Sequence, residues 1–213
     1  NVKGDDLYVV TEYHQGGDLR HLLQLSEVEM GWDVVVEMLL QVSKAIEHLH
    51  GLELIHRDIK TQNIVLGRNL TVILCDFGFA RHASQRQQAM TICGTDEFMA
   101  PEIIFGMEYG VAADMFSLGV VACEVIARRI PGEGGFLVRQ PMNGFEVNMD
   151  EVTAVAPDML PPALLELNLK LCSNSPETRP AARDAVKALL GILNALPVSK
   201  TTPLYVGGSH KWF

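Results

Sequence analysis

His56-Arg57-Asp58-Ile59-Lys60-Thr61-Gln62-Asn63 is the stretch of sequence that decides the fold. It combines a histidine, an arginine and an aspartate in a row with an asparagine five positions after the aspartate, which is a specific pattern. A second motif, Asp76-Phe77-Gly78, is weak by itself, because a fixed tripeptide occurs by chance in roughly 3% of chains of this length. A third motif, Ala100-Pro101-Glu102, follows a long polar segment. Three motifs in this order in one chain predict one shared functional site.

Together these motifs resemble the catalytic-loop, metal-loop and activation-segment signatures of eukaryotic protein kinases. The resemblance covers nearly everything from Leu7 to about Leu196. It implies an α+β fold, namely a mainly α-helical kinase C-terminal lobe with short β-hairpins. It also divides the chain into the end of the N-terminal lobe with the hinge (1–17), the C-terminal lobe (18–197, with the catalytic loop at 56–63 and the activation segment at 76–102) and a tail or linker (198–213).

Five residues carry the transfer of the ATP γ-phosphate in the scheme that the resemblance implies. Asp58 accepts the proton of the substrate hydroxyl, and Lys60 contacts the γ-phosphate. Asn63 and Asp76 hold Mg²⁺, an ion that prefers hard oxygen ligands. Thr95 bridges Asp58 and Lys60.

A further set of residues contacts the nucleotide if the resemblance holds. Thr11 is the gatekeeper at the back of the pocket, and the backbone of Glu12 and His14 pairs with the adenine edge. Asp18 accepts from the ribose hydroxyls, and Val65 forms the apolar floor under the adenine.

Cys75 stands directly before Asp76 and is expected beside the phosphates. Two interpretations of this thiol stay open. It is a site for covalent inhibitors if the thiol is exposed, and otherwise it is a small buried hydrophobic residue.

Other residues match architectural positions of the family. Asp114 matches the aspartate that anchors the catalytic loop from below, and Glu102 with Arg179 matches a buried ion pair. His56 and Phe77 match two stacked members of the regulatory spine. These five residues are expected to hold the site in shape.

Hydrophobic periodicity predicts the elements independently of the family. Residues 111–127 are apolar nearly all round and predict a buried central helix, in which Phe116 stands where the family usually has tryptophan. Asp18 is a candidate helix cap. The other expected elements are a strand at 7–11, helices at 18–25, 32–49, 161–172 and 180–196, a hairpin of 63–66 with 71–75, and a loop at 132–148.

The polar segment 78–99 is too long for an ordinary connection, and such segments are usually functional. Arg57 is the type of residue that pairs with a phosphate there. Thr91 is the preferred phosphosite for an upstream activating kinase and Ser84 the second, unless both are plain polar loop residues. Asp96 and Glu97 are expected next to the substrate channel, where their negative charges would favour protein substrates with basic residues near the target hydroxyl.

Much of the ATP clamp of the family is missing from the sequence. No G-x-G-x-x-G and no V-A-I-K stands before Leu7, and the chain begins with Asn1. We therefore expect a fragment that lacks most of the N-terminal lobe, and that is inactive when isolated.

Composition excludes several classes of protein. With 26 acidic and 17 basic residues the formal charge is -9, which is unsuited to nucleic-acid binding. No run is long and apolar enough for a membrane segment. The four cysteines form no C-x-x-C pair, which favours a reducing compartment, and we expect a cytoplasmic protein.

The expected function is a protein serine/threonine kinase that uses ATP and Mg²⁺ on protein substrates. Lys60 and Gly94-Thr95 resemble the Ser/Thr-specific kinases, and residues 94–99 are similar to the tyrosine-kinase-like branch. One alternative is a non-catalytic kinase-like binding or scaffold module, although nothing in a scaffold requires Asp58, Asn63 and Asp76. The other is a small-molecule kinase, against which the activation segment argues.

Overall fold

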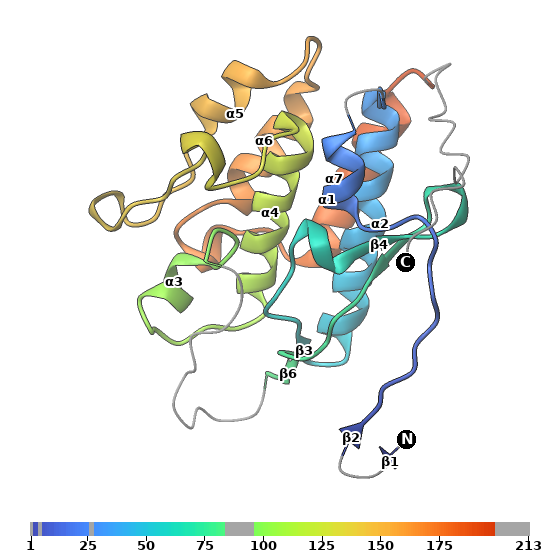
Figure 1. The fold of residues 1–213 in the computed structure, drawn as a ribbon. Helices are drawn as coiled ribbons and strands as arrows, with labels where there is room; N and C mark the ends of the chain where they lie inside the picture. The colour runs from blue at the N-terminus through green and yellow to red at the C-terminus, as the bar shows by residue number, and fades with distance from the viewer. Residues whose placement is uncertain (1, 4–5, 26–27, 84–95, 199–213) are drawn as a thin grey trace.

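The computed structural model of the chain describes residues 2–3, 6–25, 28–83 and 96–198. Within them, seven α-helices form most of the body (Figure 1). These helices are α1 (Leu19–Gln24), α2 (Trp32–Gly51), α3 (Pro101–Ile104), α4 (Ala112–Ala127), α5 (Met149–Val155), α6 (Pro162–Leu171) and α7 (Ala182–Ala195). Three antiparallel strand pairs accompany them: β1 (Val2–Lys3) with β2 (Asp6–Leu7), β3 (Leu54–Ile55) with β6 (Arg81–His82), and β4 (Ile64–Leu66) with β5 (Val72–Leu74).

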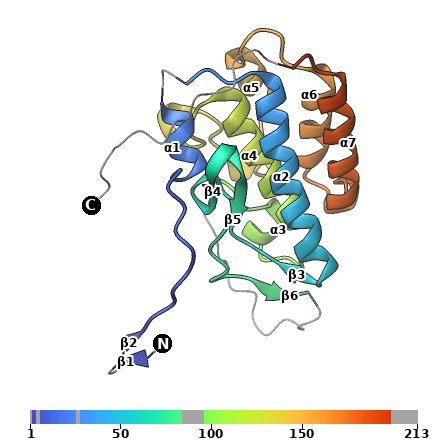
Figure 2. The ribbon, with the colours of Figure 1, turned by 90° about the vertical axis from the view of Figure 1, so that its right-hand side faces the viewer.

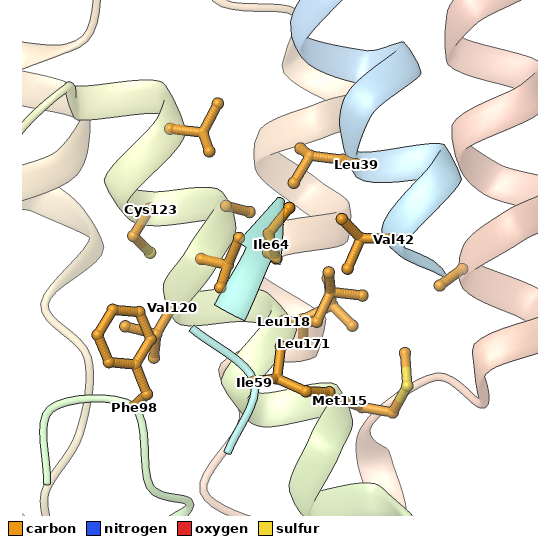
Figure 3. Close-up of a cluster of buried hydrophobic side chains, with 14 of the residues drawn as sticks. Leu39, Val42, Ile59, Ile64, Phe98, Met115, Leu118, Val120, Cys123 and Leu171 are labelled. Carbon is orange, nitrogen blue, oxygen red and sulfur yellow. The ribbon is translucent and has the colours of Figure 1, made fainter. Parts of the chain in front are cut away.

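The helix α4 is the centre of the core, as its apolar sequence predicts. All of its residues from Ala113 to Ala127 are buried. Leu39 and Val42 of α2 and the side chains of Ile59 and Ile64 lie in the same cluster (Figure 3). The catalytic-loop segment therefore rests directly on the helical core, while α7 packs along α2 on the other side (Figure 2).

The turn before α1 shows how local sequence joins the helical body to β4. Asp18 caps α1, because its Oδ1 accepts from the His21 backbone N–H at 2.8 Å. Gly16 N–H donates to the Leu66 carbonyl at 3.1 Å, and a Cβ on Gly16 would lie 2.2 Å from that oxygen. Only glycine allows the chain to pass this close, so the first glycine of the predicted turn is required.

Several parts of the fold differ from the sequence predictions. Of the strand expected at 7–11, only Leu7 lies in a strand, as the last residue of β2 (Asp6–Leu7). No strand of the described chain pairs with residues 9–11. The side chains of Val9 and Val10 are accordingly 81% and 83% exposed. The strand β6 lies in the polar segment, where two residues give no readable period. The helix α5, which begins after the expected loop 132–148, was not predicted.

The helices α1, α2, α4, α6 and α7 and the hairpin β4–β5 are confirmed to within a few residues, whereas the short helix α3 and the strand β3 were not predicted. None of the helices in the described ranges is long and apolar enough to cross a bilayer.

Candidate active site

Asp58 lies in the loop between β3 and β4 and is only 4% exposed. The Lys60 ammonium lies 2.8 Å from Asp58 Oδ2. The Asn63 side-chain amide donates to the same Oδ2 at 2.8 Å and to the Asp58 carbonyl at 2.8 Å, because the 3₁₀ turn Thr61–Asn63 brings it back over the loop. Three of the five residues predicted to be catalytic therefore form one buried, charge-assisted cluster.

Asp114, at the start of α4, holds this loop from below as predicted. Its Oδ2 accepts from the His56 backbone N–H and its Oδ1 from the Arg57 backbone N–H, both at 2.9 Å. His50, at the end of α2, donates from Nε2 to Oδ2 at 3.0 Å, a contact that the sequence analysis missed. The carboxylate is 1% exposed and stands in the first turn of a helix, where the dipole favours a negative charge.

Asp76 follows β5 and is exposed, unlike Asp58. The Cys75 N–H donates to the Asn63 carbonyl at 2.9 Å, so the two predicted metal ligands lie on adjoining segments. Asp76 has a φ of 62°, a left-handed conformation that aspartate tolerates better than most residues. Its Oδ1 accepts from the Gly78 N–H at 3.2 Å.

The predicted stack of His56 and Phe77 is confirmed. The ring centroids are 5.1 Å apart at an angle of 58°. His56 Nε2 donates to the Cys75 carbonyl at 3.1 Å, and Nδ1 accepts from the Asp58 N–H at 3.3 Å, so both bonds fit one neutral tautomer. Phe77 itself is 49% exposed.

Arg57, predicted to bind a phosphate, is held by two neighbours. It donates from Nε to the Phe79 carbonyl and from Nη1 to the Tyr109 hydroxyl at 2.9 Å. The predicted phosphosites Thr91 and Ser84, and the predicted bridging residue Thr95, lie outside the described residues.

The predicted nucleotide contacts divide into two groups. Asp18 pairs with Val65 in a β-bridge, and the charges of Asp76 and Asp18 act on Cys75, so these four lie around one place. Burial raises the pKa of the Cys75 thiol, and the two carboxylates raise the same pKa further. The thiol is half-buried and protonated at neutral pH, which weakens it as a nucleophile.

The second group lies on the exposed chain that precedes α1. Thr11 and Glu12 are exposed, and His14 Nε2 stands 3.9 Å from the Glu12 carboxylate. In Figures 1 and 2 this chain runs away from the helical body. The structure therefore does not gather Thr11 and Glu12 with Val65 and Cys75.

Glu102 and Arg179 form the buried ion pair that was predicted. The two nitrogens Nη1 and Nη2 of Arg179 donate to the two carboxylate oxygens at 2.6 and 2.8 Å. The same guanidinium lies 5.0 Å from the centroid of the Phe116 ring. The pair ties α3, at the end of the activation segment, to the segment before α7.

A second buried acid was not assigned any role from the sequence. Glu124 of α4 is 1% exposed and accepts from the Thr61 hydroxyl at 2.8 Å and from Arg20 Nε at 3.2 Å. Burial raises the pKa of this carboxyl, and Arg20 and the hydrogen bonds partly offset that shift. The sequence did contain a signal for this acid: Glu124 is a charged residue inside a helix that is apolar nearly all round, and a buried charge needs partners.

The residues of the site suit magnesium. In Asn63, the amide nitrogen makes both hydrogen bonds, which leaves the amide oxygen as a hard ligand, and Asp76 offers an exposed carboxylate. The described residues contain no cluster of three or more His, Cys, Asp or Glu that could hold a metal ion. Mg²⁺ fits such a site, because it is commonly bound through one or two protein groups together with substrate phosphates.

A buried aspartate paired with a lysine, beside an asparagine and a second aspartate, is the arrangement that the kinase motifs predicted. The family model "Protein kinase domain" matches residues 2–189. This chain therefore belongs to the protein kinase family.

Similar proteins in Dictyostelium discoideum are named as serine/threonine-protein kinases. The chain is 39% identical over 198 residues to a probable serine/threonine-protein kinase, which covers 92% of this chain and 46% of the relative. It is 38% identical over 200 residues to the RasGEF domain-containing serine/threonine-protein kinase X, covering 93% of this chain and 21% of the relative. The chain thus spans less than half the length of these curated relatives.

Proposed function

We propose that this chain is the catalytic part of a serine/threonine protein kinase that transfers the γ-phosphate of ATP to protein hydroxyls. The buried cluster of Asp58, Lys60 and Asn63 is the observation that carries the proposal. Phosphoryl transfer requires little covalent help from the protein but needs positioned groups, and these three groups are fixed on one another in a loop that rests on the helical core. The names of the Dictyostelium relatives support the Ser/Thr assignment.

In the proposed reaction the substrate hydroxyl oxygen attacks the γ-phosphorus, and the bond between that phosphorus and the bridging oxygen of ADP breaks. The Asp58 carboxylate orients the hydroxyl and accepts its proton. The Lys60 ammonium, 2.8 Å from that carboxylate, lies close enough to contact the transferred phosphoryl group. The products are a phosphorylated protein, ADP and a proton.

Bound Mg²⁺ would neutralise phosphate charge in this site. The Asn63 amide oxygen and the Asp76 carboxylate would hold it. Thr95 is proposed to bridge Asp58 and Lys60, and the predicted ATP contacts of Thr11, Glu12, His14, Asp18, Val65 and Cys75 are part of the same proposal.

The isolated chain is proposed to be inactive. Its sequence holds no G-x-G-x-x-G loop and no matching lysine, which grip the ATP phosphates in this family. The exposed Phe77, with 49% of its surface accessible, is consistent with a face that another part of a kinase covers.

The experiment uses the natural protein that contains this chain, with ATP labelled at the γ-phosphate and a mixture of proteins and metabolites as acceptors. We expect label in phosphoserine and phosphothreonine of proteins, dependent on Mg²⁺ and lost in Asp58→Asn. Label confined to phosphotyrosine would overturn the Ser/Thr assignment, and label confined to a metabolite would establish a small-molecule kinase. Partner binding without any transfer of label would establish the scaffold alternative.

A further inference from the structure

Arg139 lies in the long connection between α4 and α5 and joins it to the end of the activation segment. Its Nη2 donates to the carbonyls of Asp96 and Met99 at 2.8 and 2.7 Å. Its Nη1 donates to the Phe145 carbonyl at 3.2 Å. One guanidinium therefore fixes three backbone oxygens on two segments that are far apart in the sequence.

The cation is largely buried but forms no ion pair with any acidic side chain of the described residues. Burial lowers the pKa of Arg139 to about 10, so the side chain stays charged at neutral pH. Its guanidinium lies 5.0 Å from the centroid of Phe116, and Arg179 lies at the same distance from this ring. The ring face, the three carbonyl dipoles and the nearby charges of Glu97 and Asp96 stabilise the buried charge.

The two segments that Arg139 joins form the walls of a cavity of about 520 Å³. Most of the lining is apolar, and its charged members are two acids and Arg139 itself: Met99, Ile104, Gly132, Leu137, Val138 and Phe145 with Asp96, Glu97 and Arg139. The walls also meet at Gly132, where a Cβ would lie 3.0 Å from Glu97 Cγ. The cavity begins next to α3, at the end of the activation segment, which in the proposed function shapes the protein-substrate groove.

We propose that Arg139 is a positioning residue that holds this cavity open for the protein substrate. The inference rests on the proposed kinase function and adds to it the residue that sets substrate affinity. Arg139 touches neither the Asp58 cluster nor the residues proposed to bind ATP. Its loss should therefore affect the KM for the protein substrate and leave the KM for ATP unchanged.

Arg139→Lys is the variant of choice, because it keeps the charge and the aliphatic stem but loses the fork that reaches three carbonyls. Arg128 offers a matched control. It too donates from one guanidinium to three carbonyls, those of Leu23, Leu25 and Val28, but it ties the end of α4 to the last turn of α1 and to the connection that follows α1. Arg128→Lys thus removes the same kind of bonds away from the cavity.

The readouts are KM for a protein substrate, KM for ATP, kcat and the thermal melting of each variant in the natural protein. We expect Arg139→Lys to raise the KM for the protein substrate about tenfold, the equivalent of one lost charged hydrogen bond. The KM for ATP should stay within about twofold, and Arg128→Lys should shift neither KM while lowering the melting temperature to a similar degree.

Each other outcome counts against the inference. Equal KM shifts in both lysine variants, an unchanged KM for the protein substrate, or a loss of cooperative melting in Arg139→Lys would show that Arg139 supports the fold in general. Wild-type protein without phosphoryl transfer would overturn the proposed function as well, whereas wild-type transfer with an unchanged KM in Arg139→Lys would overturn the inference alone.

Discussion

The predicted catalytic loop and the predicted metal loop carry one aspartate each, and the two aspartates are held in opposite ways. Asp58 is 4% exposed and is bound by Lys60 and Asn63, above a loop that Asp114 anchors through two backbone N–H groups. Asp76 is exposed, and its described hydrogen bond runs to Gly78, two residues further along its own loop. The helical body alone therefore organises the proposed base but only partly organises the proposed metal ligand.

The cause of this difference is the neighbour that each loop packs against. The catalytic loop rests on α4, the most buried helix of the described chain, and Ile59 between its polar residues is fully buried. The metal loop rests on β5 and on the ring of His56 and is open on its other side. A site with one rigid half and one open half gains its full geometry when phosphates and metal occupy it, or when another part of the protein covers it.

The largest effect is expected for Asp58→Asn, which tests the rigid half. The amide no longer accepts a proton, so the rate of phosphoryl transfer should fall about 10²–10⁴-fold. Because Lys60 and Asn63 both bind the lost charge, the free energy of unfolding should also fall by about 1–2 kcal/mol. Kinase assays and urea unfolding of the same preparation measure the two effects.

Unchanged stability in Asp58→Asn would show that the buried cluster contributes nothing to holding the loop. Unchanged activity would show that Asp58 is not the base.

Asp76→Asn tests the open half and is expected to separate activity from stability. Asparagine tolerates the left-handed backbone of this position, so the loop should keep its shape. The weakened metal site should lower the rate about 10²–10³-fold and shift the Mg²⁺ dependence to higher concentrations. The free energy of unfolding should change by less than about 0.5 kcal/mol, as for other exposed positions. A loss of stability as large as that of Asp58→Asn would remove the distinction between the two loops.

The sequence predicted the rigid half better than its surroundings. The catalytic motif, the anchor Asp114 and the pair of Glu102 with Arg179 are all found where the resemblance placed them, because each depends on a fixed spacing or on burial in a core helix. The helices α2, α4, α6 and α7 were predicted because their apolar periodicity is strong. What the motifs imply for the chemistry of Asp58 and Asp76 stays a prediction.

The parts that the sequence did not predict depend on contacts between distant segments. Arg139 stands in a stretch without periodicity, and nothing in its neighbours shows that it binds the carbonyls of Asp96 and Met99. The same holds for Arg20 with Glu124, and for β6, whose two residues pair with β3. Such contacts follow from tertiary packing, which local patterns do not contain.

The smallest effect concerns Cys75, which reports on the charge of the open half. Burial, then Asp76, then Asp18 raise the pKa of its thiol in the folded protein. An unfolded cysteine titrates near about 8.5, so this thiol contributes no pH dependence to stability well below that pH. As the pH rises through the unfolded pKa, the unfolded state loses its proton first, and stability falls.

The rate of Cys75 alkylation, measured at pH values from 7 to 10 that span about 8.5, reports the raised pKa of the thiol. Peptide mass spectrometry then quantifies the alkylated Cys75. Cys75 should react more slowly than a free cysteine at every pH below its raised pKa, because less thiolate is present. Asp76→Asn removes one of the charges that raise the pKa and should speed the reaction by about threefold or less. Buried Cys123 and Cys172 of the same protein serve as unreactive controls. Equal rates in wild type and Asp76→Asn would mean that the Asp76 charge does not act on the thiol, and that burial and Asp18 account for its raised pKa.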